Sequence, residues 1–217
     1  MIKAPILIVG AGPTGLALAL ELTYHDVPFK IIDKAKGPGE TSRAMLVVPK
    51  VLESYEKFGL AQKVTQEGII PEYAHFHSNN KRIASLPLGV MGKGQSRYSD
   101  LVTFPQDEHE QLLLEKLNDF GRAVEWKTEL VSLEQVGVQS EVTMKTDGGS
   151  KTETFDYVIG CDGASSQVRV NRAASTLKER RMNRSFMCWM QKWRGGSPLM
   201  TQVVFPSSKI ISPCSFL

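Results

Sequence analysis

Short apolar runs on either side of a glycine-rich turn dominate the start of the chain. Residues 5–9 (PILIV) form an aliphatic run that predicts a buried strand. The segment 10–15 (GAGPTG) interrupts this run, and residues 16–22 are again mostly apolar over a length that suits a helix. Residues 27–32 predict a second buried strand, which ends in Asp33. Strand, glycine turn, helix and strand in this order predict a βαβ unit.

The glycine turn matches the pattern G-x-G-x-x-G, and each residue type in it has a physical role in a dinucleotide-binding unit. Gly10 allows the tight turn, Gly12 lets a pyrophosphate approach the backbone, and Gly15 lets the helix pack closely on the sheet. Pro13 suits the first turn of a helix. Asp33 follows about 20 residues later, where this fold places an acceptor for ribose hydroxyls. We therefore assign the four turn residues to the pyrophosphate and Asp33 to the adenosine ribose.

An acidic residue at position 33 favours a free ribose diol over a ribose 2′-phosphate. The bound nucleotide is therefore expected to be of the NAD or FAD kind, and the motif does not distinguish the two. We include Lys34, next to Asp33, among the cofactor-binding residues. The alternative is an ordinary glycine turn between two core elements, with a solvated Asp33.

Three later segments narrow the choice of nucleotide. A loop rich in glycine and proline leads to Ser42-Arg43-Ala44, and residues 104–117 begin with the pattern Pro-Gln-x-x-x-Glu. Residues 155–169 (FDYVIGCDGASSQVR) contain an Asp-Gly pair directly after an apolar strand pattern. In these segments the chain resembles the FAD-dependent aromatic hydroxylases, the class A flavoprotein monooxygenases related to p-hydroxybenzoate and phenol hydroxylases. The resemblance covers about residues 4–170.

The resemblance implies roles for four further residues at the flavin end of the cofactor. Arg43 would help to bind FAD, and Gln106 would contact the flavin region. Asp162 and Gly163 would support binding of FAD and possibly of NADPH. No catalytic acid or base is indicated, because none of the four histidines has a supporting partner in the sequence: His25, His75, His77 and His109.

The remaining pattern predicts mainly strands, so the expected fold class is α/β. Residues 69–77 and 81–88 alternate around Asn79-Asn80 and predict a hairpin. Further strands are predicted at 124–126, 130–135, 142–145 and 157–159, and an amphipathic helix is predicted around Val51, Leu52, Tyr55 and Phe58. We expect a Rossmann-like FAD-binding domain over residues 1–170, in which residues 68–104 contribute part of a β-rich, substrate-covering layer.

Residues 171–217 differ from the rest, and we expect a divergent basic tail of unknown structure. They carry eight Lys or Arg and one acidic residue, Glu179. The sequence also contains no Gly-Asp dipeptide, although the family has a later Gly-Asp segment beside the flavin. We therefore expect a chain that is truncated at its C-terminal end relative to the family. The tail could derive from an altered reading frame or unspliced intron, from a diverged substrate domain, or from a basic arm.

Composition excludes several other classes of protein. The chain has 217 residues, 41% of them hydrophobic, and a net charge of +3, which is too small to indicate nucleic acid binding. Its three cysteines form no C-x-x-C pair, so neither a metal site nor a disulfide framework is predicted and a reducing compartment is favoured. The apolar run at the N-terminus is too short for a signal peptide, and no membrane span is predicted. We expect a cytoplasmic protein.

The resemblance implies an enzyme that uses FAD, NADPH or NADH, and O₂ to hydroxylate a small phenol-like molecule. One alternative is another oxidoreductase of the wider FAD fold, such as a halogenase or an oxidase. The other is a non-catalytic FAD-binding remnant, which the missing Gly-Asp segment keeps open. The sequence indicates neither the identity of the substrate nor the oligomeric state.

Overall fold

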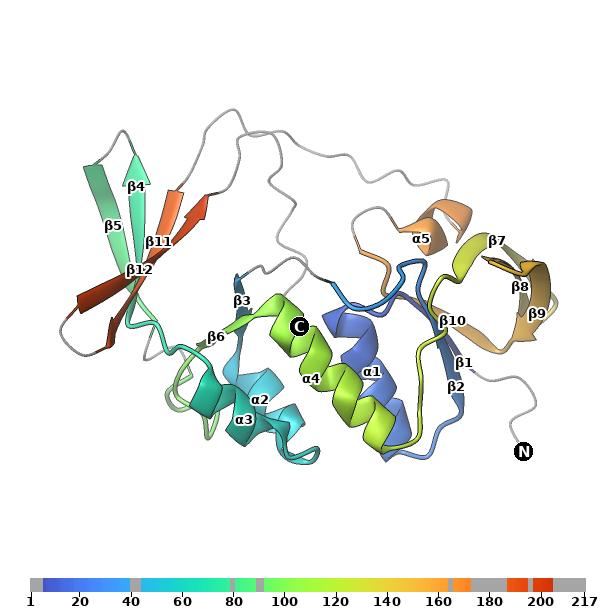
Figure 1. Cartoon of the computed structure of the whole chain (residues 1–217), viewed down its shortest axis with the longest axis horizontal. Helices are drawn as coiled ribbons and strands as arrows, with labels where there is room; N and C mark the ends of the chain where they lie inside the picture. Colours follow the sequence, from blue (N-terminus) through green and yellow to red (C-terminus); the bar gives the residue numbers. More distant parts are fainter. Residues whose placement is uncertain are drawn as a thin grey trace. The chain divides into compact units, whose positions relative to one another are not determined.

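The computed structural model describes residues 6–39, 44–78, 81–88, 92–163, 166–172, 187–194 and 197–204 (Figure 1). The chain forms two compact units, and each unit combines segments that are far apart in the sequence. The first unit contains residues 1–41 and 107–177, and the second contains residues 42–106 and 178–217. The expected division into residues 1–170 and a tail at 171–217 stays a prediction, as does the substrate-covering role of residues 68–104.

The first unit is built around a parallel sheet of three strands, in the order β10-β1-β2. The chain forms β1 (Ile6–Val9), α1 (Pro13–Tyr24) and β2 (Phe29–Ile32), and a distant segment adds β10 (Tyr157–Gly160) beside β1. The βαβ unit expected from the sequence is therefore present. Helix α1 buries an apolar face that includes Leu16, Ala19 and Leu20.

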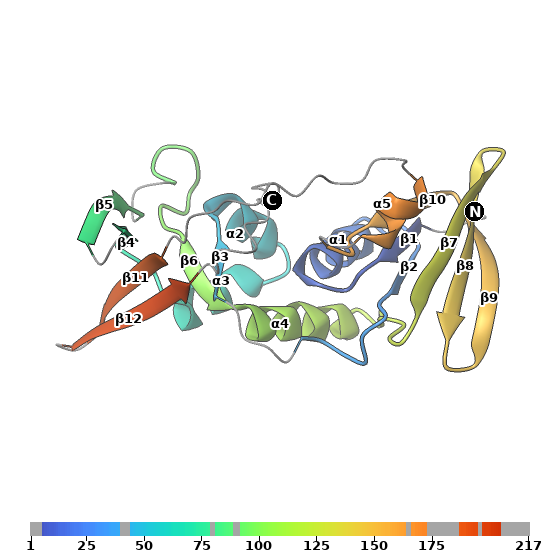
Figure 2. The ribbon, with the colours of Figure 1, turned by 90° about the horizontal axis from the view of Figure 1, so that it is seen from above.

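An antiparallel meander packs on this sheet. Its strands are β7 (Glu129–Val136), β8 (Gln139–Thr146) and β9 (Gly149–Phe155). Figures 1 and 2 both show the parallel sheet between α1 and the meander. The layers join in a buried cluster with members from both sheets: Leu7, Val9, Ile32, Leu130, Leu133, Val142, Met144 and Phe155. The alternating pattern of the strands supplies these side chains, because every second residue of a strand points to the same face.

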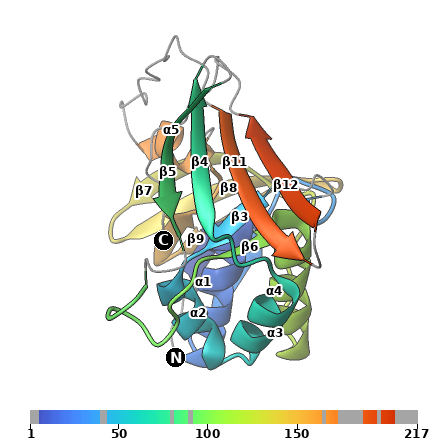
Figure 3. The ribbon, with the colours of Figure 1, turned by 90° about the vertical axis from the view of Figure 1, so that its left-hand side faces the viewer.

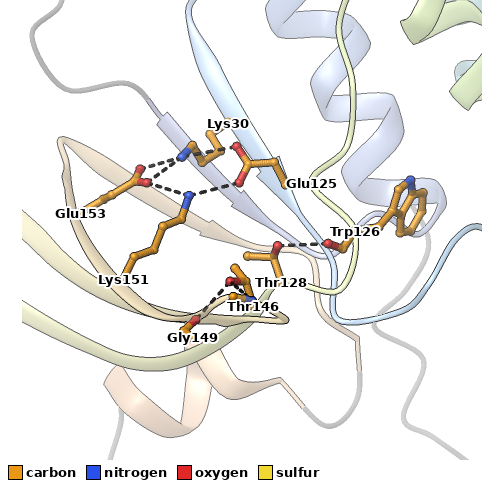
Figure 4. A network of polar contacts seen from close by, with 9 residues as sticks. Lys30, Glu125, Trp126, Thr128, Thr146, Gly149, Lys151 and Glu153 are labelled. Atoms are coloured by element: carbon orange, nitrogen blue, oxygen red, sulfur yellow. Dashed lines mark hydrogen bonds and ion pairs between the residues drawn. The ribbon is translucent and has the colours of Figure 1, made fainter.

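Charged side chains also connect the meander to the parallel sheet (Figure 4). Lys30 of β2 contacts both carboxylate oxygens of Glu153 on β9, at 2.7 and 2.9 Å. Glu125 lies 3.4 Å from Lys30 and 3.6 Å from Lys151, which in turn lies 3.0 Å from Glu153. The four side chains therefore form a closed ring of alternating charge at the junction of the two sheets.

Two helices complete the first unit. Helix α4 (Gln106–Asp119) follows the expected Pro-Gln start, and α5 (Gln167–Arg172) follows the Asp-Gly segment. Helix α4 buries Leu112, Leu113 and Leu117. The strand expected at residues 124–126 is not formed, since only Glu125 makes an isolated parallel bridge to Ile32. Two residues after Glu125, the backbone leaves the strand conformation at Lys127, which has a positive φ of 54°.

The described residues of the second unit form two antiparallel sheets and two helices (Figure 3). A two-stranded sheet joins β3 (Ala44–Val47) to β6 (Val102–Pro105), and a four-stranded sheet has the order β12-β11-β4-β5. The strands and helices that complete this unit are α2 (Pro49–Glu56), α3 (Leu60–Glu67), β4 (Tyr73–Ser78), β5 (Lys81–Pro87), β11 (Met187–Arg194) and β12 (Ser197–Val204).

The sequence predicted this unit only in part. The hairpin of β4 and β5 is confirmed, while its Asn79-Asn80 turn lies outside the described residues. The expected amphipathic helix ends at Glu56, and Phe58 is buried beyond its end, because Gly59 with φ of 71° starts the separate helix α3. Strand β11 pairs with β4, so a segment without predicted structure continues the sheet that the hairpin begins.

Candidate functional site

The glycine turn between β1 and α1 has two glycines that no other residue type could replace without a shift of the backbone. Gly10 has a φ of 105°, and a Cβ atom there would lie 2.4 Å from the carbonyl oxygen of Cys161. A Cβ at Gly15 would lie 1.9 Å from the carbonyl oxygen of Gly10. At Gly12, in contrast, no heavy atom of the described residues lies within 4 Å of the Cβ position. The turn is therefore tightly packed on one side and open above Gly12.

The N-terminus of α1 faces this open side without a capping side chain. Gly12 is the N-cap residue, Pro13 occupies the first turn, and the first turn contains no acidic residue. The first N–H groups of a helix have no partner within the helix and carry a partial positive charge. Such a helix start suits a phosphate group. The predicted pyrophosphate role of Gly10, Gly12, Pro13 and Gly15 fits this geometry and stays a prediction.

Asp33 is fixed beside the glycine turn by four hydrogen bonds. Its Oδ2 accepts from the N–H of Ala11 at 2.7 Å, and its Oδ1 accepts from the N–H of Ala35 at 2.8 Å. Its own N–H donates to the carbonyl of Glu125, and its carbonyl accepts from the N–H of Thr128. A carboxylate oxygen has two lone pairs, so each oxygen can accept one further donor, such as a ribose hydroxyl. Lys34 beside it is exposed.

The Asp-Gly segment reaches the same place from β10. The N–H of Cys161 donates to the carbonyl of Val9, which holds the segment against the end of β1. Oδ2 of Asp162 accepts from the N–H groups of Gln167 and Val168 at 2.6 and 3.2 Å, which caps α5. Oδ1 of Asp162 is buried and has no hydrogen-bond partner among the described residues. A buried acceptor without a partner is rare in native proteins and suits a ligand that donates a hydrogen bond.

Three segments therefore converge at the carboxyl ends of β1, β2 and β10. The Cβ position of Gly10 lies 2.8 Å from the backbone nitrogen of Asp162, and Asp33 bonds to Ala11 inside the glycine turn. In open α/β sheets, ligands bind outside the carboxyl ends of the strands. The glycine turn and Asp33 thus fit the adenosine diphosphate part of FAD, while the flavin-end role expected for Asp162 and Gly163 stays a prediction. Gly163 follows with a φ of 74°, which favours glycine.

The structure does not test the positions of two of the expected cofactor residues relative to this place. Arg43 lies outside the described residues. Gln106 is half-buried at the start of α4. It is the last residue of the second unit, whereas the glycine turn and Asp33 belong to the first. The roles of both residues stay predictions.

Sequence reasoning missed the backbone groups that hold Asp33, and it gave no role to Glu110. The donors are main-chain N–H groups, which leave no signature in residue type. Glu110 is 6% exposed, and its Oε2 accepts from the N–H of Gly39 at 3.0 Å. A signal for it was available, since Glu110 is the glutamate of the Pro-Gln-x-x-x-Glu pattern and recurs at helical spacing with the buried leucines of α4.

Two titratable side chains of the first unit, one of them at the site, are held in neutral form. Burial raises the pKa of the Cys161 thiol, and the negative charge of Asp162 raises it further, so a thiol is expected at neutral pH. Burial lowers the pKa of His109 to about 4, so its ring is neutral at pH 7. In the described part of the chain, no three His, Cys, Asp or Glu side chains are grouped to hold a metal ion.

Comparisons with known proteins agree with this geometry. The model of the FAD binding domain family matches residues 3–212. The chain belongs to this family. It is 34% identical over 164 residues to 6-methylpretetramide 4-monooxygenase from Streptomyces rimosus, and 32% identical over 170 residues to pentachlorophenol 4-monooxygenase from Sphingobium chlorophenolicum. Each match covers 76% of this chain, but 29% and 31% of the respective relative. The chain thus spans about three tenths of the length of these relatives.

Solved structures show the same fold. The flavin-dependent monooxygenase PieE, solved with FAD and substrate, matches 96% of this chain and 44% of its own at a TM-score of 0.76 and 21% identity. The p-nitrophenol 4-monooxygenase PnpA from Pseudomonas putida matches 77% of this chain and 43% of its own at a TM-score of 0.68 and 22% identity. The α/β fold of an FAD-binding domain and the resemblance to FAD-dependent aromatic hydroxylases are therefore confirmed. Among the described residues, no helix is both long and apolar enough to cross a membrane.

Proposed function

We propose that this chain binds FAD and forms the nucleotide-binding part of a monooxygenase that hydroxylates a small, phenol-like molecule. The observation that carries the proposal is the convergence of the open glycine turn, Asp33 and Asp162 at one edge of the parallel sheet. The relatives give the reaction class, since they include monooxygenases named for pentachlorophenol and para-nitrophenol.

Each residue of the site has a distinct task in this proposal. The glycine turn (Gly10, Gly12, Pro13 and Gly15) and the N-terminus of α1 bind the pyrophosphate, because N–H groups and the helix dipole offset its negative charge. Asp33 accepts the hydroxyls of the adenosine ribose, and the exposed Lys34 adds positive charge beside it. Arg43, Gln106, Asp162 and Gly163 act at the flavin end.

Bound FAD would supply the redox chemistry, with NADPH or NADH as the source of electrons and O₂ as the source of the hydroxyl oxygen. The protein's part is to hold the cofactor and to keep water from the reaction. The proposal includes a small aromatic substrate, no nucleic acid partner and a cytoplasmic location. The last of these rests on the cysteine usage of the sequence.

A second candidate is a non-oxidative role for the bound cofactor. The chain is 30% identical over 167 residues to a protein named dialkyldecalin synthase from Streptomyces rugosporus, of which it covers 33%. Its fold also matches that of the Diels-Alderase PyrE3 at a TM-score of 0.63. These names show that the FAD-binding fold also occurs in proteins that are not called monooxygenases.

The first experiment is a titration of the purified chain with FAD, followed by visible absorption and by quenching of flavin fluorescence. A stoichiometric flavin spectrum would support the proposed cofactor. NADPH consumption with a panel of phenols then separates the two candidates. Consumption that depends on the phenol supports hydroxylation, and FAD binding without it favours the non-oxidative role. A chain that does not bind FAD would contradict both.

A further inference from the structure

Residues 125–128 run along the edge of β2 that faces away from β1, and they hold the backbone of Asp33. The N–H of Asp33 donates to the carbonyl of Glu125 at 3.1 Å, and its carbonyl accepts from the N–H of Thr128 at 2.9 Å. Strand β1 pairs with the other edge of β2, and the glycine turn follows β1. Asp33 therefore lies between the glycine turn on one side and residues 125–128 on the other.

The side chain of Trp126 points to the same face of the sheet as Asp33. Glu125 forms a parallel bridge with Ile32, and Ile32 packs in the cluster that joins the parallel sheet to the meander. Successive residues of an extended chain point to opposite faces. Trp126 and Asp33, each one residue further along, therefore point to the face that carries α1. Figure 4 agrees, since it shows the indole of Trp126 directed away from the carboxylate of Glu125.

The backbone on either side of this indole is fixed. The hydroxyl of Thr128, a residue that is itself buried, donates to the carbonyl of Trp126 at 3.1 Å. The N–H of Lys127 donates to the carbonyl of Ala35 at 2.8 Å, in the loop that follows Asp33. Trp126 is half-buried, so part of its ring surface is accessible to solvent. The chain thus presents a flat aromatic surface on a restrained segment beside Asp33.

The chemistry of adenosine directs its base toward this surface. In the ribose, the base is attached to the carbon next to the two hydroxyls, and the phosphate is attached through the exocyclic carbon on the other side of the ring. If Asp33 accepts from the hydroxyls and the glycine turn binds the phosphate, the base extends away from the turn. Residues 125–128 lie on that side of Asp33. Aromatic side chains bind bases by stacking on their faces.

We propose that the indole of Trp126 stacks on the adenine base of FAD. The inference rests on the proposed function, in which Asp33 binds the ribose of the same nucleotide. It assigns a residue to the base, for which the sequence indicated none. Because the segment is already restrained, little conformational freedom is lost when the base binds.

The test measures FAD affinity by quenching of flavin fluorescence in three variants. Trp126→Leu should weaken FAD binding about tenfold, because it keeps an apolar side chain but removes the aromatic face. Trp126→Phe keeps such a face and should stay within about threefold of wild type. Phe120→Ala is the control, since Phe120 is exposed just beyond the C-terminal end of α4, and it should bind as wild type does.

Competition with ADP locates the effect on the nucleotide, because ADP carries the base and the ribose but no flavin. ADP should displace FAD from wild type, and its own affinity should fall in Trp126→Leu by the same factor as that of FAD. A loss for FAD without a loss for ADP would overturn the inference. Equal FAD affinity in Trp126→Leu and Trp126→Phe would also overturn it, because the side chain would then act only by packing.

Intrinsic fluorescence gives a second measurement that does not depend on the leucine variant folding well. ADP should quench part of the tryptophan emission of wild type, and this quenching should be lost in Trp126→Phe, which keeps the two other tryptophans, Trp189 and Trp193. The same quenching in both proteins, or none in wild type, would overturn the inference. Normal FAD binding with either result would leave the proposed function intact, whereas a wild-type chain that does not bind FAD would contradict both.

Discussion

The carboxylate of Asp33 accepts a hydrogen bond from the backbone N–H of Ala11, 22 residues earlier in the chain, at 2.7 Å. This bond joins the end of β2 to the middle of the glycine turn. The second carboxylate oxygen is held by Ala35 at 2.8 Å. Asp33 therefore has a structural task in addition to its proposed contact with ribose, and the two tasks are open to separate measurement.

Asp33→Asn should weaken FAD binding by about 10- to 100-fold, because it removes a charge-assisted acceptor for a ribose hydroxyl. The asparagine oxygen can replace one of the two backbone contacts, so the melting temperature should fall less than in Asp33→Ala. Flavin fluorescence titration and thermal unfolding measure the two effects. Asp119→Asn is the matched control, since Asp119 is exposed at the far end of α4. FAD affinity unchanged in Asp33→Asn would rule out the ribose role.

Gly12→Ala and Gly15→Ala should separate cofactor binding from folding. A Cβ at Gly12 meets no described atom within 4 Å, so Gly12→Ala should fold normally and lose FAD affinity as the methyl group blocks the pyrophosphate. A Cβ at Gly15 would lie 1.9 Å from a backbone oxygen, so Gly15→Ala should be destabilised by several kcal/mol or fail to fold. Circular dichroism melts and FAD titration report the two properties. A stable Gly12→Ala variant with normal FAD binding would contradict the pyrophosphate assignment.

The sequence predicted the parts of the first unit whose constraints are local. The βαβ order, strands β7 and β8 and the tight turn at Gly10 follow from apolar periodicity and from residues that tolerate unusual backbone geometry, such as Gly10 with its φ of 105°. The four hydrogen bonds that fix Asp33 were not predictable in this way. Two of them depend on backbone groups of Glu125 and Thr128, which come beside β2 only once the chain has folded.

The second unit was harder to predict for a similar reason. Strand β11 is defined by its pairing with β4, over 100 residues earlier in the chain, and its own sequence, Met-Cys-Trp-Met-Gln-Lys-Trp-Arg, has no clear alternation of apolar and polar residues. Helix α3 was missed because Gly59 starts it only two residues after α2 ends at its C-cap, Lys57. A short helix of this kind has a weak periodic signal.

His109 should make the stability of the chain depend on pH. Its pKa is lowered to about 4 by burial, whereas a histidine in the unfolded chain has a pKa of about 6.5. Between these values the unfolded chain binds a proton that the native chain does not. Stability is therefore present above pH 6.5 and is lost as the pH falls toward 4. The loss between pH 7.5 and pH 5 should be about 2 kcal/mol.

Urea unfolding at pH 7.5 and pH 5 measures this loss, and His109→Gln should abolish most of it. The comparison is made between the two pH values within each variant, so a general destabilisation by the substitution does not affect it. His25→Gln is the control, since His25 is exposed and should leave the pH dependence as it is in wild type. The same pH dependence in His109→Gln and wild type would show that other groups cause it.

The charged ring at the junction of the sheets should stabilise the first unit more than an isolated surface pair does. Burial alone would raise the pKa of Glu153, but hydrogen bonds from Lys30 and Lys151 outweigh it and hold the pKa below its usual value. Lys30 and Glu153 are also half-buried, with side chains 21% and 32% exposed, whereas Lys127 and Asp147 form a pair that is 51% and 75% exposed. Glu153→Gln should therefore lower the free energy of unfolding by about 1 kcal/mol, and Asp147→Asn by less than about 0.5 kcal/mol.

Urea unfolding at low and high salt distinguishes these two cases. Salt screens exposed charges more strongly than partly buried ones, so the effect of Glu153→Gln should persist in about 0.5 M salt while that of Asp147→Asn disappears. FAD affinity should not change in either variant. Lys30, the member of the ring on β2, lies two residues before the end of that strand, and not at the carboxyl edge that holds Asp33. Equal losses of stability in the two variants would mean that the ring behaves as an ordinary surface pair.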